Sequence, residues 1–294
     1  SLGVQAFLRL YVYQTRMTKN WSSPNLKEAE SIARLARSIL GWKTLIKVEP
    51  FLGVLLTEQA ATVFAGSSDE ERVGLQTFHP TWFVKYCFRI FGRSQTLAML
   101  EANAQPPPTY VRLNTLKAEE KHIVERLSEE GVRLEKVEQL HNTYRVVAAR
   151  QPVTRTSSFE EGLFQVQDKA SCFTVEAANP QPGMTILDVC AAPGAKTTHL
   201  AQLMQNRGSI LSIDYSKRRI AVWKNEIVRT GVNIAELIIA DARSPSPFTE
   251  KADITVLDPP CTGTGTFGKT PSAKWRLTRR SIERMAQIQW QMLN

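Results

Sequence analysis

An apolar run that leads into a tight turn of small residues constrains this chain more than any other feature. Residues 185–204 read TILDVCAAPGAKTTHLAQLM. The run at 185–189 is typical of a buried parallel strand, and the apolar side chains at Leu200, Leu203 and Met204 predict a helix over 195–204. Between them, residues 191–194 form the turn. A strand, a small-residue turn and a helix in this order place backbone N–H groups at a helix N-terminus, which is where a nucleotide-like ligand binds.

The next predicted strand narrows the kind of ligand. Residues 208–213 are apolar and are followed by Asp214, and an acidic residue about 20 positions beyond a glycine turn usually binds a ribose diol. The turn lacks the G-x-G-x-x-G pattern of dinucleotide sites and the G-K-[ST] of a P-loop. An adenosine ligand without phosphates fits better, and S-adenosylmethionine (SAM) is the commonest such ligand. An ordinary strand–helix turn without a ligand remains the alternative when the turn is considered alone.

Four predicted strands each end near a carboxylate. Strands over 235–240 and 252–257 lead to Asp241 and Asp258, as the first two lead to Asp188 and Asp214. In an open parallel sheet these strand ends line one crevice. A single aspartate there is often only a helix cap, but four in register favour a binding site. The fold class we predict is therefore α/β, with a Rossmann-like parallel sheet.

The chain divides into three predicted regions. Residues 1–102 have helical apolar spacing, for example over 4–11 and 29–40, and a further short helix is predicted over 94–102. Residues 103–164 begin with a proline-rich linker and continue as a small α/β segment, with strands at 110–114 and 144–147, a helix at 119–130 and irregular chain over 151–164. Residues 165–294 hold the parallel-sheet core, introduced by Asp168 as the N-cap of a helix over 169–178.

Composition restricts the partners and the compartment. The chain has 294 residues, with 37 Lys+Arg against 28 Asp+Glu and a formal charge of +9, which favours a polyanion such as RNA. The basic residues that follow the last predicted strand are Lys269, Lys274, Arg276, Arg279 and Arg280, and we expect them to face RNA. No apolar run reaches the roughly 18 residues of a membrane span.

The cysteines argue for a reducing compartment. Cys87, Cys172, Cys190 and Cys261 have no C-x-x-C spacing, which argues against a zinc site and against a disulfide framework. We therefore expect no metal ion and a cytoplasmic protein. The chain starts with Ser1, so we expect its beginning to differ from a natural N-terminus.

Cys261 is the candidate for chemistry. Asp258, Pro259, Pro260 and Cys261 precede a Gly-rich loop, and a cysteine beside a strand-end carboxylate is a candidate nucleophile or acid/base thiol. The alternative is an inert buried thiol. An enzyme that methylates an amino group would carry an aromatic residue after D-P-P. The cysteine at that place indicates attack on a carbon through a covalent adduct.

These motifs resemble those of a known family. DVCAAPGAKTTHLA, QDKAS, DPPCTGTGTFG and the KW-R of residues 274–276 resemble the Sun/Fmu/NSUN family of RNA 5-methylcytosine methyltransferases. NAQPPPTYVRLNT and HPTW are similar to signatures of its ribosomal-RNA branch. Residues 1–102 resemble that branch's NusB-like domain, and we describe the segment over 103–164 as RRM-like. Ala195, where the family usually has glycine, and Pro259, where alanine is common, depart from the pattern.

The resemblance implies an activity and a set of site residues. It implies a transferase of the EC 2.1.1 class that uses SAM to methylate carbon 5 of cytosine in RNA during rRNA processing. Asp258 assists at the cytosine ring, Lys196 contacts substrate or orders the Asp258 loop, and Cys261 assists product release. Asp214 binds the cofactor's ribose and Asp241 its adenine edge, and we add Arg219 and Asp258 to the cofactor contacts. The methionine part of SAM is held by Cys190, Ala191, Ala192, Pro193, Gly194, Ala195 and Lys196.

The family's attacking cysteine lies on a later T-C-[ST] motif, which residues 1–294 do not contain. We therefore expect the chain to lack the C-terminal part of the catalytic domain, and the main nucleophile to lie beyond residue 294. Two alternatives stay open: a non-catalytic fragment that binds RNA and SAM, and a nucleotide-dependent oxidoreductase of similar fold. We expect a monomer. Ribosomal and transfer RNA both remain possible substrates.

Overall fold

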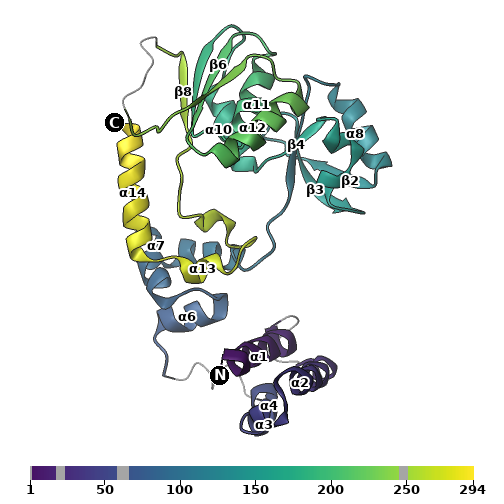
Figure 1. Cartoon of the computed structure of the whole chain (residues 1–294), viewed down its shortest axis with the longest axis vertical. Helices are drawn as coiled ribbons and strands as arrows, with labels where there is room; N and C mark the ends of the chain where they lie inside the picture. Colours follow the sequence, from purple (N-terminus) through teal and green to yellow (C-terminus); the bar gives the residue numbers. More distant parts are fainter. Residues whose placement is uncertain (1, 18–23, 58–65, 245–250) are drawn as a thin grey trace. The chain divides into compact units, whose positions relative to one another are not determined.

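The computed structural model describes residues 2–17, 24–57, 66–244 and 251–294. The chain divides into two compact units, Ser1–Thr96 and Leu97–Asn294 (Figure 1). The first unit is helical in its described residues, as the sequence predicts. The second holds two sheets. Each unit is therefore considered by itself.

Amphipathic helices build the first unit. Asn25 caps α2, because its side chain accepts a hydrogen bond from the backbone N–H of Glu28, and α2 buries Ala29, Ile32 and Ala36 against α1. The predicted helix over 94–102 is the second half of α7, which breaks at Gly92 with φ 73°. The helices are α1 Leu2–Val12, a π-helix Tyr13–Met17, α2 Leu26–Leu40, α3 Trp42–Leu45, α4 Glu49–Thr57, α6 Asp69–Thr77 and α7 Thr81–Ala102.

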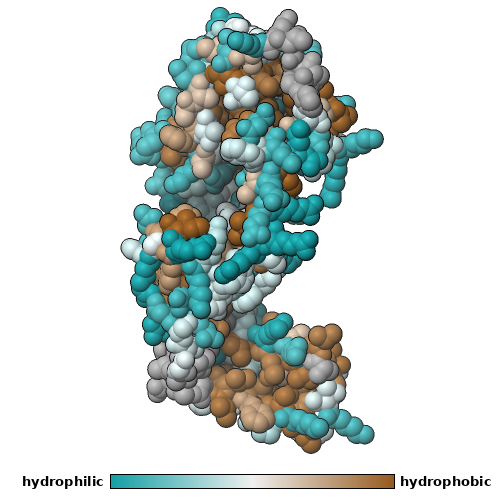
Figure 2. All heavy atoms as spheres, turned by 90° about the vertical axis from the view of Figure 1, so that its left-hand side faces the viewer, coloured by the Kyte–Doolittle hydropathy of each residue, from teal (hydrophilic) through white to brown (hydrophobic). Residues whose placement is uncertain are grey.

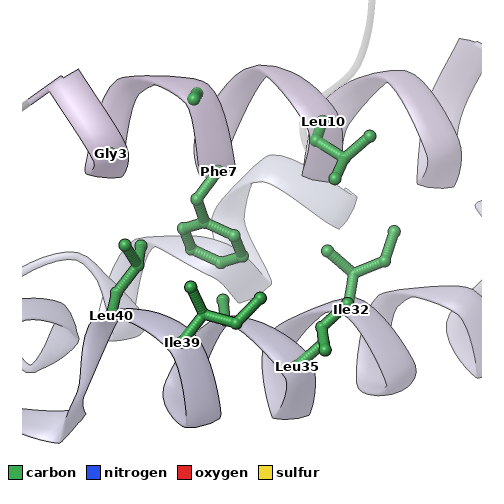
Figure 3. A pocket seen from close by; sticks show the side chains of 9 residues that line it. Gly3, Phe7, Leu10, Ile32, Leu35, Ile39 and Leu40 are labelled. Atoms are coloured by element: carbon green, nitrogen blue, oxygen red, sulfur yellow. The ribbon is translucent and has the colours of Figure 1, made fainter.

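Much of the apolar surface of the first unit is exposed. Phe7, Ile32 and Leu40 line a shallow groove between α1 and α2 (Figure 3), and Leu35 and Ile39 at its edge are 56% and 70% exposed. The space-filling view shows hydrophobic side chains gathered over this unit (Figure 2). With so few layers, these helices cannot bury every apolar side chain that they carry.

The second unit begins with a four-stranded antiparallel sheet in the order β2-β3-β1-β4. Helices α8 and α9 complete a β-α-β-β-α-β pattern, that of ferredoxin-like folds. Strands β2 and β4 are additions to the prediction, and the expectation of irregular chain throughout 151–164 is wrong. The elements are β1 Tyr110–Leu113, α8 Glu120–Glu129, β2 Val132–Lys136, β3 Thr143–Ala149, a 3-10 turn Val153–Arg155, α9 Ser157–Glu160 and β4 Phe164–Val166.

A second sheet confirms the predicted parallel fold. Its four strands are all parallel and run in the order β7-β6-β5-β8, so the order reverses at β5, beside β8. In such sheets the ligand crevice lies at the carboxyl ends of the strands at this reversal. The elements are α10 Lys169–Ala178, β5 Thr185–Val189, α11 Ala195–Leu203, β6 Ser209–Asp214, α12 Lys217–Thr230, β7 Ala235–Ile239 and β8 Ile254–Leu257.

Short helices follow the parallel sheet. They are a 3-10 turn Thr264–Thr266, α13 Ala273–Arg276 and α14 Arg279–Leu293, which Thr278 and Ser281 start with a capping box. None of the helices in the described ranges is long and apolar enough to cross a membrane. Within the same residues, no group of three or more His, Cys, Asp or Glu side chains could hold a metal ion.

Candidate functional site

The turn after β5 is tied to the next strand by two hydrogen bonds. The backbone N–H of Ala191 donates to the carbonyl oxygen of Ile213 at 3.0 Å, and that of Ala192 donates to Oδ2 of Asp214 at 3.1 Å. Gly194 has φ +109°, and a Cβ there would lie 3.2 Å from Cδ1 of Trp223. Only glycine suits this position. The turn therefore places the N-terminus of α11 at the strand ends. The first N–H groups of a helix have no intrahelical partners, so they are free to bind a ligand there.

Asp214 is the acceptor that closes this turn. Its Oδ1 also accepts a hydrogen bond from the N–H of Ser216 at 2.9 Å, and Nη1 of Arg219 lies 3.4 Å from its Oδ2. The residue is 2% exposed. A carboxylate has about four lone-pair sites, so Asp214 retains acceptor capacity for a ribose diol in addition to these contacts.

Lys196 and Asp258 form an ion pair across the crevice, between α11 and the end of β8. Nζ of Lys196 lies 2.6 Å from Oδ2 of Asp258, with side-chain exposures of 16% and 58%. Of the two roles that the sequence left open for Lys196, this contact favours ordering of the Asp258 loop. Cys261 follows on that loop and is exposed, which argues against an inert buried thiol.

Cys190 differs from Cys261 in its environment. Burial and, to a smaller extent, the nearby carboxylate of Asp214 raise the pKa of the Cys190 thiol to about 11. At neutral pH this side chain is therefore a thiol and not a nucleophilic thiolate. Its backbone, with φ +64°, is part of the turn, in keeping with a contact made through main-chain atoms.

Asp241 lies beyond β7 and is held by Arg243. The arginine donates from Nε to both carboxylate oxygens, at 3.0 and 3.1 Å, and from Nη2 to Oδ2 at 2.5 Å. These bonds lower the pKa of Asp241 to about 2. A bound adenine would have to share this carboxylate with Arg243. Tyr215, which the sequence analysis did not consider, directly follows Asp214 and is 61% exposed at the same strand end.

A buried chain of hydrogen bonds joins α12, α11 and β5 next to the turn. Nε1 of Trp223 on α12 donates to Oγ1 of Thr197 at 3.1 Å, and Thr197 donates to Oδ2 of Asp188 at 2.6 Å. Burial raises the pKa of Asp188 to about 6, although the bond from Thr197 acts in the opposite direction. The sequence predicts Asp188 but not its partners, because neither Thr197 nor Trp223 stands in a pattern that differs from ordinary helix residues.

This pKa predicts how Asp188→Asn changes stability with pH. The carboxyl group of the unfolded chain ionises near 3.8, so its contribution is most favourable below that pH and is lost as the pH rises through about 6. The difference corresponds to about 3 kcal/mol. Asparagine carries no charge and keeps an acceptor for Thr197. Between about pH 4 and pH 8, the free energy of unfolding of the variant should therefore gain about 3 kcal/mol relative to wild type.

Urea unfolding from about pH 3 to pH 8 measures the effect. The comparison at about pH 3, where the Asp188 carboxyl is mostly protonated in both states, serves as the internal control for any packing change caused by the amide. Stability curves that stay parallel from pH 4 to pH 8 would show that the Asp188 carboxyl ionises normally.

The predicted RNA-facing basic residues separate into two groups. Lys274 is 3% exposed, and burial lowers its pKa, so the expectation that it faces RNA is wrong. Lys274 lies in α13 directly before the exposed Trp275 and points to the buried side of this short helix. Lys269, Arg276, Arg279 and Arg280 are exposed.

Comparison with known proteins identifies similar sequences. The model of the 16S rRNA methyltransferase RsmB/F family matches residues 175–294, and that of the RsmF/B ferredoxin-like domain matches residues 79–152. A probable ribosomal RNA small subunit methyltransferase B of Bacillus subtilis is 29% identical over 292 residues, which cover 97% of this chain and 64% of the relative.

Two further relatives extend the likeness. The human 28S rRNA (cytosine(4447)-C(5))-methyltransferase is 34% identical over 205 residues, which cover 69% of this chain and 25% of that protein. The crystal structure of a methyltransferase homolog from Pyrococcus horikoshii superposes with a TM-score of 0.68 at 28% identity, covering 77% of this chain and 72% of that one. The chain thus spans less than two thirds of the length of these curated relatives.

Proposed function

Since the chain belongs to the RsmB/RsmF methyltransferase family, we propose that its second unit binds S-adenosylmethionine and serves methylation of cytosine carbon 5 in RNA. Residues 190–196 would hold the methionine part of the cofactor, with Asp214 at the ribose and Asp241 at the adenine edge. Arg219 and Asp258 would complete the cofactor contacts. The activity belongs to the complete protein, of which this chain is taken as a part.

One observation carries the cofactor proposal: carboxylates lie at the ends of neighbouring parallel strands, and three of them hold a basic side chain. Lys196 pairs with Asp258, Arg219 with Asp214 and Arg243 with Asp241. These three cations are not left unpaired for a pyrophosphate, and the turn lacks the glycine pattern of a dinucleotide site, which disfavours an oxidoreductase. SAM carries an ammonium, a sulfonium and a carboxylate but no phosphate, so strand ends rich in carboxylates suit its net positive charge.

The proposed chemistry uses the loop after β8. Asp258, which Lys196 holds in place, would help to protonate ring nitrogen 3 of the cytosine and would then accept a hydrogen bond from that N–H. The family resemblance assigns attack on carbon 6 to a later cysteine, and SAM, when bound, supplies the methyl group for carbon 5. Cys261, exposed on the same loop, would then assist loss of the carbon-5 proton and release of the product.

We also propose rRNA as the substrate, since the relatives named above carry rRNA methyltransferase names. Exposed basic residues near the Cys261 loop would contact its phosphates. The protein would act as a monomer in the cytoplasm. A non-catalytic fragment that binds SAM and RNA stays the second candidate for residues 1–294, because the resemblance places the attacking cysteine outside them.

Titration calorimetry with SAM tests the proposal on Asp214→Ala. Loss of the carboxylate removes the ribose partner and releases the Ala192 amide, so SAM should bind more weakly by about 1–3 kcal/mol. Asp253→Ala is the matched control, because Asp253 accepts a hydrogen bond from Thr185 at the start of β5, at the opposite edge of the parallel sheet from Asp214, and should leave SAM affinity unchanged. NAD should give no heat of binding with the wild-type chain.

Two results would contradict the proposal. Tight binding of NAD in place of SAM would favour an oxidoreductase. Equal SAM affinity of wild type and Asp214→Ala would remove Asp214 from the cofactor site.

A further inference from the structure

A buried arginine joins the two sheets of the second unit. Arg112 lies in β1 and is 1% exposed. Its neighbours Val111 and Leu113 point into the core of the antiparallel sheet, so alternation along the strand turns Arg112 to the opposite face. There its Nε donates to Oε1 of Gln167 at 2.9 Å and its Nη2 to Oγ1 of Thr198 at 2.9 Å, while Nη1 donates to Oε1 of Gln202.

All three acceptors are neutral, although Arg112 carries a charge. Burial lowers the pKa of Arg112 to about 10, which keeps the guanidinium protonated at neutral pH. The same charge, together with burial, lowers the pKa of the neighbouring His199 well below its usual value. A buried charge without an opposite charge is costly, so the desolvation of the guanidinium offsets the gain from its three hydrogen bonds. Stability alone therefore does not account for an arginine at this place.

The bonds of Arg112 reach the helix that forms the cofactor turn. Thr198 lies in the first turn of α11, where its N–H donates to the carbonyl of Gly194 at 2.9 Å and its hydroxyl donates to that of Ala195 at 3.1 Å. Gln202, one turn later, donates back to the carbonyl oxygen of Leu113 at 2.9 Å. Strand β1 thus holds α11 at two successive turns, directly behind the turn of residues 190–194.

We propose that Arg112 is a positioning residue for the cofactor site, through which the antiparallel sheet sets the place of α11. The inference rests on SAM binding at this turn, as proposed above. Arg112 would not contact the cofactor itself, since its hydrogen bonds end on Gln167, Thr198 and Gln202. It fixes where the N-terminus of α11 lies, and binding sites lose affinity when their supporting contacts shift by about 1 Å.

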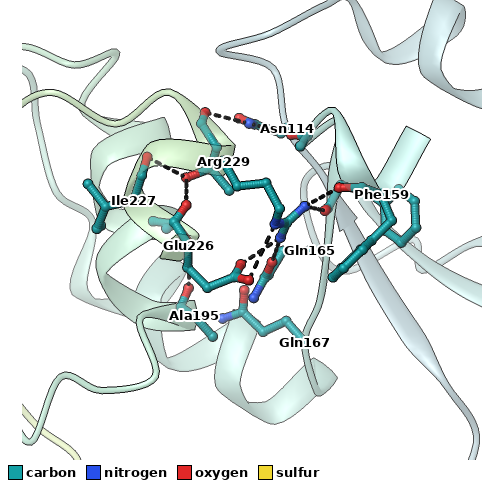
Figure 4. Close-up of polar contacts among 12 residues, drawn as sticks. Asn114, Phe159, Gln165, Gln167, Ala195, Glu226, Ile227 and Arg229 are labelled. Atoms are coloured by element: carbon teal, nitrogen blue, oxygen red, sulfur yellow. Dashed lines mark hydrogen bonds and ion pairs between the residues drawn. The ribbon is translucent and has the colours of Figure 1, made fainter. Parts of the chain in front are cut away.

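Arg229 provides a matched comparison. It lies near the C-terminal end of α12 and also joins the two sheets, since it donates to the carbonyl oxygens of Phe159 and Phe164 and pairs with Gln165 and Glu226 (Figure 4). Arg112 is fully buried, and the side chain of Arg229 is largely buried. Its bonds end on the carbonyl oxygens of Phe159 and Phe164 and on the side chains of Gln165 and Glu226, and none of these four residues belongs to α11.

The experiment compares Arg112→Met, Arg112→Lys and Arg229→Lys. SAM affinity is measured by calorimetry and stability by thermal unfolding. Arg112→Met should weaken SAM binding about tenfold or more while keeping at least the stability of Arg229→Lys. Arg112→Lys, which retains the charge but not the three-way bonding, should also bind weakly. Arg229→Lys should keep SAM affinity within about twofold, although it loses stability.

Amide hydrogen exchange of the free protein gives a second readout that needs no cofactor. Exchange at residues 190–198 should be faster in Arg112→Met than in wild type and unchanged in Arg229→Lys. If the wild type binds no SAM, the proposed function fails while this exchange result still decides the role of Arg112. Equal loss of affinity in the Arg112 and Arg229 variants, or unchanged exchange at 190–198, would overturn the inference.

Discussion

Gly162→Ala should lower the free energy of unfolding of the second unit by more than about 4 kcal/mol. A Cβ at this position would lie 1.9 Å from the carbonyl oxygen of Arg229 and 2.7 Å from its carbonyl carbon. Both are backbone atoms of α12, which no side-chain rotation can move. Relief of the clash requires α12 to separate from the antiparallel sheet, and the bonds of Asn114 to the carbonyl oxygens of Gly162 and Thr230, both 2.8 Å, would be lost.

Gly183→Ala separates this clash from backbone strain. Gly162 has φ +76° and Gly183 has φ +95°, but a Cβ at Gly183 would meet nothing within 4 Å. The control should therefore lose only about 1 kcal/mol, the cost of a left-handed conformation. Chemical unfolding followed by circular dichroism compares the two variants. A loss in Gly162→Ala no larger than that in Gly183→Ala would show that α12 and the antiparallel sheet are not in this close contact.

The parallel sheet could be predicted because its strands carry strong local signals. Strands at 185–189 and 209–214 are buried on both faces, so their sequences are continuous apolar runs that end near aspartates. The helix at 217–230 has an apolar face and ends at Gly231, with φ +75°. Each signal depends on a few adjacent residues and needs no knowledge of the partner strand.

Strands β2 and β4 could not be predicted for the opposite reason. Both are edge strands, and β4 has only three residues, Phe164–Val166. Strand β4 pairs with β1, which lies far from it in the sequence. Strand β2 pairs with β3, and the register of that pairing shifts along the strand. The bulge between Arg133 and Leu134 further disturbs the alternation that would have marked β2.

The site shows the same limit. Strand-end aspartates were predicted because each is a local feature, but their partners come from other elements. Thr197 and Trp223 meet Asp188 only after α11 and α12 have packed on the sheet. Arg112 reaches Gln202 across 90 positions of the chain. Lys274 was expected on the surface from its charge alone, and its burial depends on how α13 lies.

Replacement of Cys261 by serine should make a covalent protein–RNA complex accumulate. The family resemblance implies that the complete protein carries a second cysteine in a T-C-S motif. That cysteine would still attack the cytosine when Cys261 is replaced by serine. Breakdown of the adduct would lack its thiol. The variant should therefore accumulate a stable protein–RNA complex, seen as a slow band on a denaturing gel, whereas wild type should show little.

The opposite role for Cys261 predicts the opposite result. A thiol exposed on the loop of Asp258 could itself attack the base, because nucleophile and release group both need a partly ionised sulfur near the substrate. In that case Cys261→Ser abolishes the adduct in the complete protein, and residues 1–294 with intact Cys261 form it alone. The release role predicts that residues 1–294 trap no RNA. The two roles predict opposite results for the complete protein and for residues 1–294. A single gel with both proteins, the Cys261→Ser variant and a Cys87→Ser control therefore assigns the role of Cys261.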